Sequence, residues 1–308
     1  MLKFIRSLLI IGLALLVGCT RSSVHVADMG SLSGLQALAN VKSKSNKNAR
    51  RGGAMRAAAL SEIALSLGAQ AGLACRANTI NKHLAKQARI LDAVFDFNSL
   101  VLDHNILPPV LLEGRNTLNL ADTQTIRVSD RTYKIAKQAR FITTPPNWRE
   151  YLWMDYKQPE PPNLFMLPKT KAERKAWKTC VARGWKNGIE QANTILEESI
   201  ARIKEDYTGM ILYRKLLALN MVSAPFVAST ELGVTGDASE IHIDDRVLRI
   251  TALPGLNVNS NEWRAAVAKD ENALEQFKNM EKLAQNAQIN ITSKAWQPVI
   301  APINEKKY

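Results

Sequence analysis

The chain has 308 residues, of which 46% are hydrophobic and 22% are charged, a composition that is ordinary for a globular protein. Its formal net charge of +13 suits anionic lipid headgroups, acidic partner proteins or, less well, DNA, and composition does not choose among these. Only three cysteines occur, without a Cys-x-x-Cys pair, which excludes a disulfide-rich scaffold and leaves open whether Cys75 and Cys180 pair.

The first residues have the order of a lipoprotein signal peptide, which we predict over residues 1–18. Two cations precede an apolar run of about ten residues, too short to span a bilayer. The run ends in a predicted lipobox, Leu16-Val17-Gly18-Cys19. The first three of these residues would be recognised by the signal peptidase, and the thiol of Cys19 would take the diacylglycerol. Because Thr20 rather than Asp follows, we expect a bacterial lipoprotein anchored in the outer membrane, with its domain facing the periplasm.

Residues 19–53 are expected to form a flexible tether. Its last part, 42–53, is basic and polar and has no apolar periodicity. Leu32, Leu35 and Leu38 fall at helical spacing, so a short amphipathic turn that docks on a partner is the alternative to a solvated linker. No later segment is expected to be apolar enough to span a membrane.

The remainder, 54–308, is predicted to be one α+β domain in which helices predominate. Apolar spacing predicts a helix over 54–74 and a second from about Thr79, paired as an antiparallel hairpin. A capping box, Thr170 with Glu173, begins the strongest predicted helix, which reaches about Asp206 and carries possible breaks at its glycines.

Further helices are predicted over 210–221 and from about residue 260 to 283. Two small antiparallel β-hairpin units complete the predicted fold. The first has strands at 125–129 and 132–142 around a turn at Asp130-Arg131. The second spans 226–253, with the segments 240–244 and 246–252 on either side of a turn.

The most tempting candidate site is Glu240-Ile-His242-Ile-Asp244. On a strand the two carboxylates and the imidazole share one side, where they could hold a divalent metal in a periplasmic hydrolase. The alternative is that Ile241 and Ile243 face the core and the polar residues form the wet face of a sheet.

Other residue clusters have structural explanations. The aromatic segment 148–156 could stack bases or rim a pocket, but a small core or a protein–protein anchor uses the same residues. A basic run in 169–178 is typical of a solvated helix face. No standard catalytic motif is present, so we expect no enzyme activity and no cofactor, and a binding or scaffolding role.

Five longer blocks carry a resemblance to a known family; they lie at 68–76, 95–116, 141–156, 184–193 and 240–250. With these blocks the chain resembles the DotC lipoproteins of Dot/Icm type IVB secretion systems. The resemblance implies a non-enzymatic component of the outer-membrane core complex that serves effector translocation. It also implies two partners, a DotD-like lipoprotein and a DotH-like protein, and lipidation of Cys19.

Overall fold

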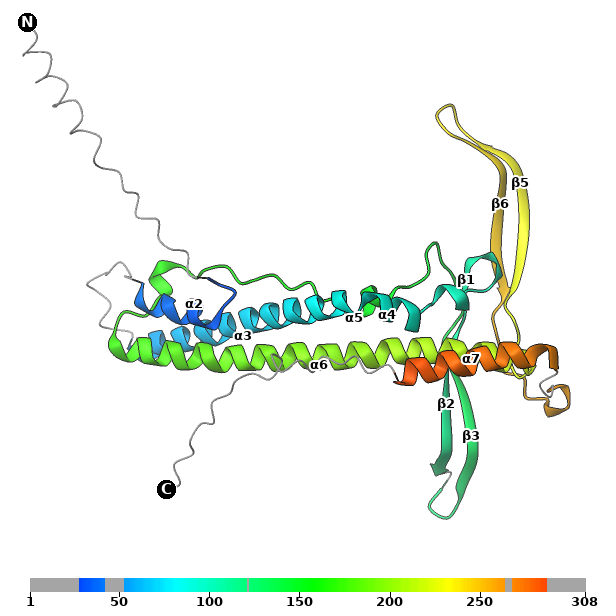
Figure 1. The fold of residues 1–308 in the computed structure, drawn as a ribbon, viewed down its shortest axis with the longest axis horizontal. Helices are drawn as coiled ribbons and strands as arrows, with labels where there is room; N and C mark the ends of the chain where they lie inside the picture. Colours follow the sequence, from blue (N-terminus) through cyan, green and yellow to red (C-terminus); the bar gives the residue numbers. More distant parts are fainter. Residues whose placement is uncertain (1–27, 42–52, 121, 264–267, 287–308) are drawn as a thin grey trace, which may run out of the picture. The chain divides into compact units, whose positions relative to one another are not determined.

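The computed structural model describes residues 28–41, 53–120, 122–263 and 268–286, and Figure 1 labels its elements. The chain divides into two compact units. Unit 1 comprises Met1–Cys75 and Lys157–Ile189, and unit 2 comprises Arg76–Tyr156 and Glu190–Tyr308. Two long helices, α3 (Gly53–Lys86) and α6 (Lys171–Ala218), contribute residues to both units. The single domain expected over 54–308 therefore stays a prediction.

Within unit 1, α3 and α6 are in backbone contact through glycines four residues apart on each helix. The four are Gly68, Gly72, Gly184 and Gly188. A Cβ added at Gly68 would meet the backbone of Val181 and lie 3.0 Å from the amide nitrogen of Trp185. A Cβ added at Gly188 would lie 2.7 Å from the amide nitrogen of Leu73. Contacts advance in the same direction along both helices, so the pair is parallel.

This arrangement corrects two sequence predictions. The antiparallel hairpin between 54–74 and a helix from Thr79 is wrong, because α3 continues through this region without a turn. The breaks considered at Gly184 and Gly188 are also absent, since α6 is continuous there. Both glycines are needed for the close approach of the helices rather than for a turn.

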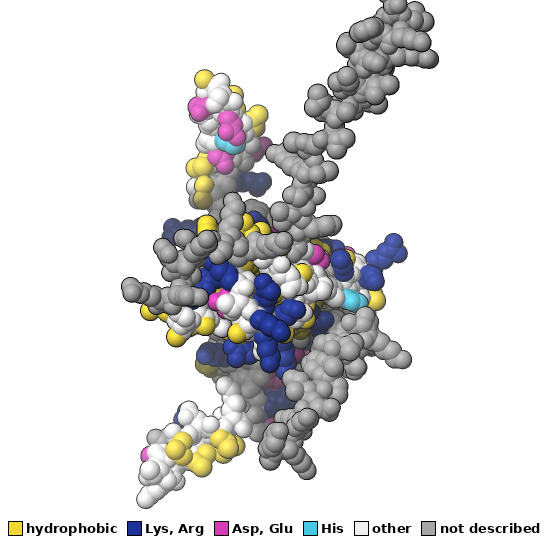
Figure 2. Space-filling view, turned by 90° about the vertical axis from the view of Figure 1, so that its left-hand side faces the viewer, with side chains coloured by type: hydrophobic (Ala, Val, Ile, Leu, Met, Phe, Trp, Pro, Cys, Tyr) yellow, Lys and Arg dark blue, Asp and Glu magenta, His cyan; other side chains and the backbone are white. Residues whose placement is uncertain are grey.

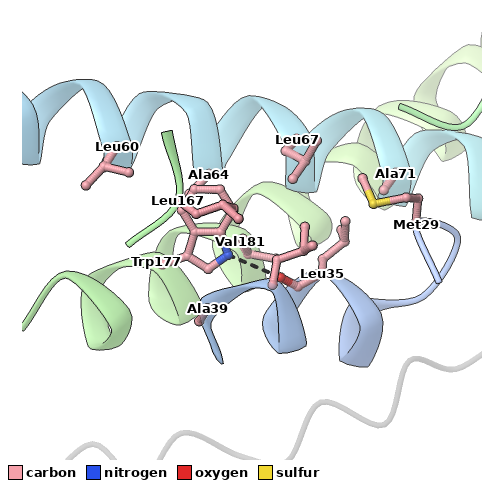
Figure 3. Close-up of a cluster of buried hydrophobic side chains, with 11 residues drawn as sticks. Met29, Leu35, Ala39, Leu60, Ala64, Leu67, Ala71, Leu167, Trp177 and Val181 are labelled. Carbon is pink, nitrogen blue, oxygen red and sulfur yellow. Dashed lines mark hydrogen bonds between the residues drawn. The ribbon is translucent and has the colours of Figure 1, made fainter. Parts of the chain in front are cut away.

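Helix α2 (Leu32–Ala37) and the 3-10 turn η1 (Leu38–Asn40) belong to the core of unit 1. Leu35 and Ala39 are fully buried. The indole Nε1 of Trp177 donates a hydrogen bond of 3.1 Å to the carbonyl oxygen of Leu35, as Figure 3 shows. The amphipathic turn predicted inside the 19–53 segment therefore docks on the chain itself, and residues 28–41 are part of a folded core.

One described helix, α3, is long and apolar enough by length and composition to cross a membrane. From the sequence we expected no segment after the signal peptide to be apolar enough to span a membrane, so this helix differs from that expectation. The buried core helix of a soluble domain passes the same test, and α3 carries such a face. Leu60, Ala64, Leu67 and Ala71 are buried in the unit 1 cluster with Trp177. We therefore interpret α3 as a core helix.

Unit 2 contains three antiparallel strand pairs: β1 (Ile106–Leu107) with β4 (Arg140–Phe141), β2 (Val110–Leu120) with β3 (Ile126–Lys137), and β5 (Phe226–Gly236) with β6 (Ile241–Ala252). The predicted fold class, a mostly helical α+β fold with small antiparallel hairpin units, is confirmed. The turn predicted at Asp130-Arg131 is wrong, because β3 runs straight through it and Arg131 pairs with Arg115 of β2. Strand β6 likewise continues past Asp244.

The helices α4 (Ala88–Val94), α5 (Trp148–Leu152) and α7 (Ala268–Asn286) complete the α-helices described in unit 2. The separate helix predicted over 210–221 is wrong, since α6 passes through Gly209 to Ala218. The capping box that begins α6 is confirmed. The amide of Glu173 donates to Thr170 Oγ1 at 3.1 Å, and the amide of Thr170 donates to the Glu173 carboxylate at 3.2 Å.

Candidate partner-binding surfaces

The β2–β3 hairpin is fixed to α6 at its base. Val110 and Leu111 are buried, and a Cβ added at Gly209 would lie 2.5 Å from Val110 Cγ1 and 2.7 Å from the carbonyl oxygen of Leu111. Leu111 belongs to a buried cluster with Tyr213 and Leu216 of the same helix. The base of the hairpin is thus held by close packing on the helix.

A buried carboxylate adds a polar anchor at the same place. Lys137 Nζ, at the end of β3, lies 2.6 and 2.7 Å from the two carboxylate oxygens of Asp206 on α6. The hydroxyl of Tyr151 donates to the same carboxylate at 2.9 Å. Burial, and then the charge of Asp206, raise the pKa of Tyr151, so it remains a neutral donor. Both oxygens of the carboxylate are occupied, which makes this cluster an anchor rather than an open site.

The distal half of the same hairpin carries an apolar face. Leu118 pairs with Val128 and Leu120 with Ile126, so the four side chains share one side of the ribbon. Each is between 58% and 71% exposed. The opposite side is polar and includes the pair Asn119 and Arg127. A two-stranded ribbon with an uncovered apolar side is typical of a surface that a partner covers.

The β5–β6 hairpin exposes a second apolar cluster. Val234, Ile241 and Ile243 are between 67% and 75% exposed. The expectation that Ile241 and Ile243 face a core is therefore wrong. A two-stranded hairpin has no further layer to cover either side, so alternation along β6 does not create a buried face.

The metal site considered at Glu240, His242 and Asp244 is not formed. His242 Nε2 lies 3.7 Å from Glu240 Oε1, and both side chains are more than half exposed. Asp244 has a φ of +58°, which interrupts the regular alternation that would align it with the other two. Among the described residues, no group of three His, Cys, Asp or Glu side chains is placed to hold a metal.

The two hairpins differ in charge. Strands β2 and β3 carry five cations, Arg115, Arg127, Arg131, Lys134 and Lys137, against two carboxylates, Glu113 and Asp130. The segment from β5 to β6 carries five carboxylates, Glu231, Asp237, Glu240, Asp244 and Asp245, against two cations, Arg246 and Arg249. Figure 2 shows hydrophobic surface on both hairpins and acidic side chains beside it on β5–β6. The two apolar clusters therefore suit different partner surfaces.

The aromatic segment is mainly structural. Trp148 is buried, and its Nε1 donates to Asp92 Oδ1 at 2.6 Å. Tyr151 stacks on Phe97 with ring centroids 5.8 Å apart. Trp153 and Tyr156, by contrast, are 48% and 41% exposed. The core interpretation holds for the first two residues, and only the last two are available to a partner.

The remaining candidates resolve as follows. Cys75 and Cys180 are not joined by a disulfide in the structure. Gly68 of α3 lies opposite Val181, the neighbour of Cys180 on α6. Cys75 is therefore about seven residues, roughly 10 Å, farther along the helix pair than Cys180, which is too far for a disulfide. The predicted lipidation residue Cys19 and the recognition residues Leu16, Val17 and Gly18 lie outside the described residues.

Sequence reasoning missed the apolar face of β2–β3, although a signal was present. Leu118-x-Leu120 and Ile126-x-Val128 alternate on both sides of a short polar segment, which is a hairpin pattern. It also missed the exposed turn at 164–166, because the four consecutive apolar residues 164–167 between prolines resemble an ordinary core segment. The burial of these residues depends on their neighbours in space.

A family model matches residues 54–265 of the chain, and its family is described as type IV secretory system, conjugal DNA-protein transfer. The match covers more than half of the chain, which therefore belongs to this TraI family of type IV secretion proteins. No curated protein matches the chain. The resemblance to DotC lipoproteins is wrong, since the matching family is a conjugal-transfer family and all five blocks quoted for DotC lie within 54–265.

Proposed function

We propose that this type IV secretion protein is a non-enzymatic structural subunit, anchored in the outer membrane by acylated Cys19, with its domain in the periplasm. The family match supports the secretion context. The observation that carries the structural role is the uncovered apolar face of β2–β3, which is fixed rigidly to α6 at its base. A partner that covers this face would remove apolar surface from water at little cost in backbone entropy.

Sister subunits of the secretion apparatus are the partners that this role requires. A DotD-like and a DotH-like protein were expected as partners only through the DotC resemblance, and the family match does not support that resemblance. The two hairpins, one basic and one acidic, favour two different neighbours. Each neighbour should present an apolar patch with a complementary charged rim.

The test of the hairpin replaces one side of the ribbon at a time. Leu118→Ser with Val128→Ser removes the apolar cross-strand pair, whereas Asn119→Ser with Arg127→Ser alters the adjacent pair on the other side. Both variants change exposed residues and should fold normally. Burial of each apolar side chain contributes about 1.5–3 kcal/mol. We therefore expect the first variant to lose crosslinks to sister subunits in the membrane fraction by more than tenfold, and the second to keep them. Equal crosslinking in both would contradict the proposal.

The membrane anchor has its own test. Cys19→Ser should leave a folded protein that no longer fractionates with outer membranes in cells lacking the other secretion subunits. Cys180→Ser is the matched control, because it removes a thiol without touching the lipobox. Full retention of the Cys19→Ser protein in the outer membrane would refute the lipid anchor.

A further inference from the structure

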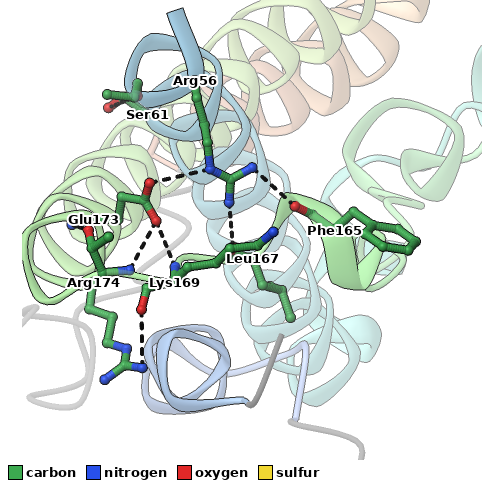
Figure 4. Close-up of polar contacts among 9 residues, drawn as sticks. Arg56, Ser61, Phe165, Leu167, Lys169, Glu173 and Arg174 are labelled. Carbon is green, nitrogen blue, oxygen red and sulfur yellow. Dashed lines mark hydrogen bonds and ion pairs between the residues drawn. The ribbon is translucent and has the colours of Figure 1, made fainter. Parts of the chain in front are cut away.

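An apolar turn in unit 1 is held in an exposed position by polar contacts. The turn is η5 (Leu164–Met166), whose three side chains are between 46% and 56% exposed. Asn163 Oδ1 accepts a hydrogen bond of 3.1 Å from the amide of Phe165. Arg56 donates to the carbonyl oxygens of Phe165 at 3.3 Å and Leu167 at 3.0 Å, as Figure 4 shows. The backbone is thus fixed while the hydrophobic side chains remain in water.

The first turns of α6, which follow directly, form a cationic stripe. It consists of Lys171, Arg174, Lys175 and Lys178, which fall at i, i+3, i+4 and i+7 and are all exposed. The one acidic residue in these turns, Glu173, is engaged by Arg56 at 3.3 Å. It therefore does not offset the stripe. Figure 2 views the side on which α6 begins and shows basic side chains gathered there.

We propose that η5 and this stripe together form a docking face for an anionic phospholipid bilayer. Exposed Leu, Phe and Met beside Lys and Arg is the combination that binds at a membrane interface, since the apolar groups enter the acyl boundary and the cations meet the headgroups. A nucleic acid would bind the cations through its phosphates but would leave the aliphatic side chains of Leu164 and Met166 in water.

The length of chain before the described residues fits this position. The inference rests here on the proposed lipid anchor at Cys19. Eight residues lie between Cys19 and Asp28, and the nine Cα–Cα steps that join the two give a reach of at most about 30 Å. Met29 lies in the same cluster as Ala71 of α3, and Ala71 is about 22 Å along the helix from Arg56, which holds η5. The anchor can therefore reach the plane of the docking face, and it cannot let unit 1 move far from the bilayer.

The test uses the mature chain from residue 19 with Cys19→Ser, so that no acyl chain contributes. Binding is measured by flotation with phosphatidylcholine vesicles and with vesicles that also contain phosphatidylglycerol. We expect binding to the second kind alone. Each cation near the surface contributes about fivefold to affinity, so Lys171→Gln, Lys175→Gln and Lys178→Gln together should weaken binding about a hundredfold.

Two further variants separate a specific face from net charge. Phe165→Ser should weaken binding to the anionic vesicles although it leaves the charge unchanged. The triple variant Arg127→Gln, Arg131→Gln and Lys134→Gln on β3 removes the same charge from another exposed surface and should bind like the unsubstituted chain. An equal loss with the β3 variant, or no vesicle binding at all, would overturn the docking face.

Duplex DNA is the remaining arm of the experiment. Binding of the chain to duplex DNA through the same lysines, without binding to anionic vesicles, would overturn the proposal in favour of a nucleic-acid surface. None of these outcomes depends on acylation. Failure of the docking face is therefore distinguishable from failure of the Cys19 anchor, which only the cell fractionation tests.

Discussion

The parallel contact between α3 and α6 predicts an unusual response to alanine. In an isolated helix, replacing glycine with alanine stabilises the helix by about 1 kcal/mol per site. In unit 1, however, a Cβ at Gly188 would lie 2.7 Å from the amide nitrogen of Leu73 and 2.9 Å from the carbonyl carbon of Ala69. A Cβ at Gly184 would lie 2.9 Å from the carbonyl carbon of Leu65. Ordinary carbon contacts are about 3.5–4.0 Å, so the helices would have to separate.

The size of the effect follows from which atoms are struck. Overpacking a close-packed contact costs about 1–3 kcal/mol per site, and backbone atoms cannot rotate away as a side chain can. We therefore take the upper half of this range, about 2–3 kcal/mol per site, and subtract the propensity gain of about 1 kcal/mol per site, so Gly184→Ala with Gly188→Ala should lower the free energy of unfolding by about 2–4 kcal/mol. Urea denaturation of the chain from residue 19 onward, followed by far-ultraviolet circular dichroism, would measure this loss.

A control lies between the two glycines. Asn187 is exposed on the same helix, and Asn187→Ala should stabilise the protein by about 0.5 kcal/mol, since only helix propensity changes. If the double glycine variant were stabilised like Asn187→Ala, the close parallel contact would be refuted.

Substitutions at two other residues test the polar anchors. Asp206→Ala leaves the hydroxyl of Tyr151 and the ammonium of Lys137 without their acceptor. It should lower the free energy of unfolding, measured by urea denaturation, by about 2–3 kcal/mol, because hydrogen bonds to charged groups contribute about 1.5–3 kcal/mol and the half-exposed lysine regains water. Asp206→Asn keeps an acceptor and should cost less. Burial raises the pKa of Glu173, but two backbone amides and Arg56 outweigh it and hold the pKa below its ordinary value of 4.5. Its contribution to stability is therefore present above about pH 4.5 and is lost as the pH falls through the lowered pKa, so the deficit of Glu173→Gln should be full at neutral pH and shrink in acid.

Local chemistry was predictable where the residues that decide it are close in the chain. Thr170 and Glu173 begin α6 as expected, because a capping box involves only neighbouring side chains and amides. Alternating apolar residues likewise indicated strand in both hairpin regions. The partner of β3 was not predicted, since pairing with β2 depends on a register across the intervening turn.

The sequence predictions were wrong at positions whose role depends on segments far away in the chain. Glycines 184, 188 and 209 resemble breaks in sequence, yet each lies inside one continuous helix where another backbone comes too close for a side chain. The alternation of Ile241 and Ile243 predicted one side of a strand correctly but not whether that side is covered.

The sequence by itself determined the apolar periodicity, the helix start at Thr170 and the class of fold, whereas the lipobox stays a prediction and the membrane anchor a proposal. The tertiary structure alone decided which apolar residues remain in water: Leu118 and Val128 on β2–β3, and the turn at Leu164–Met166. Both surfaces consist of residue types that usually form a core. Burial depends on whether another segment covers a side chain, and that is a property of three-dimensional packing rather than of the residue or its neighbours in the chain.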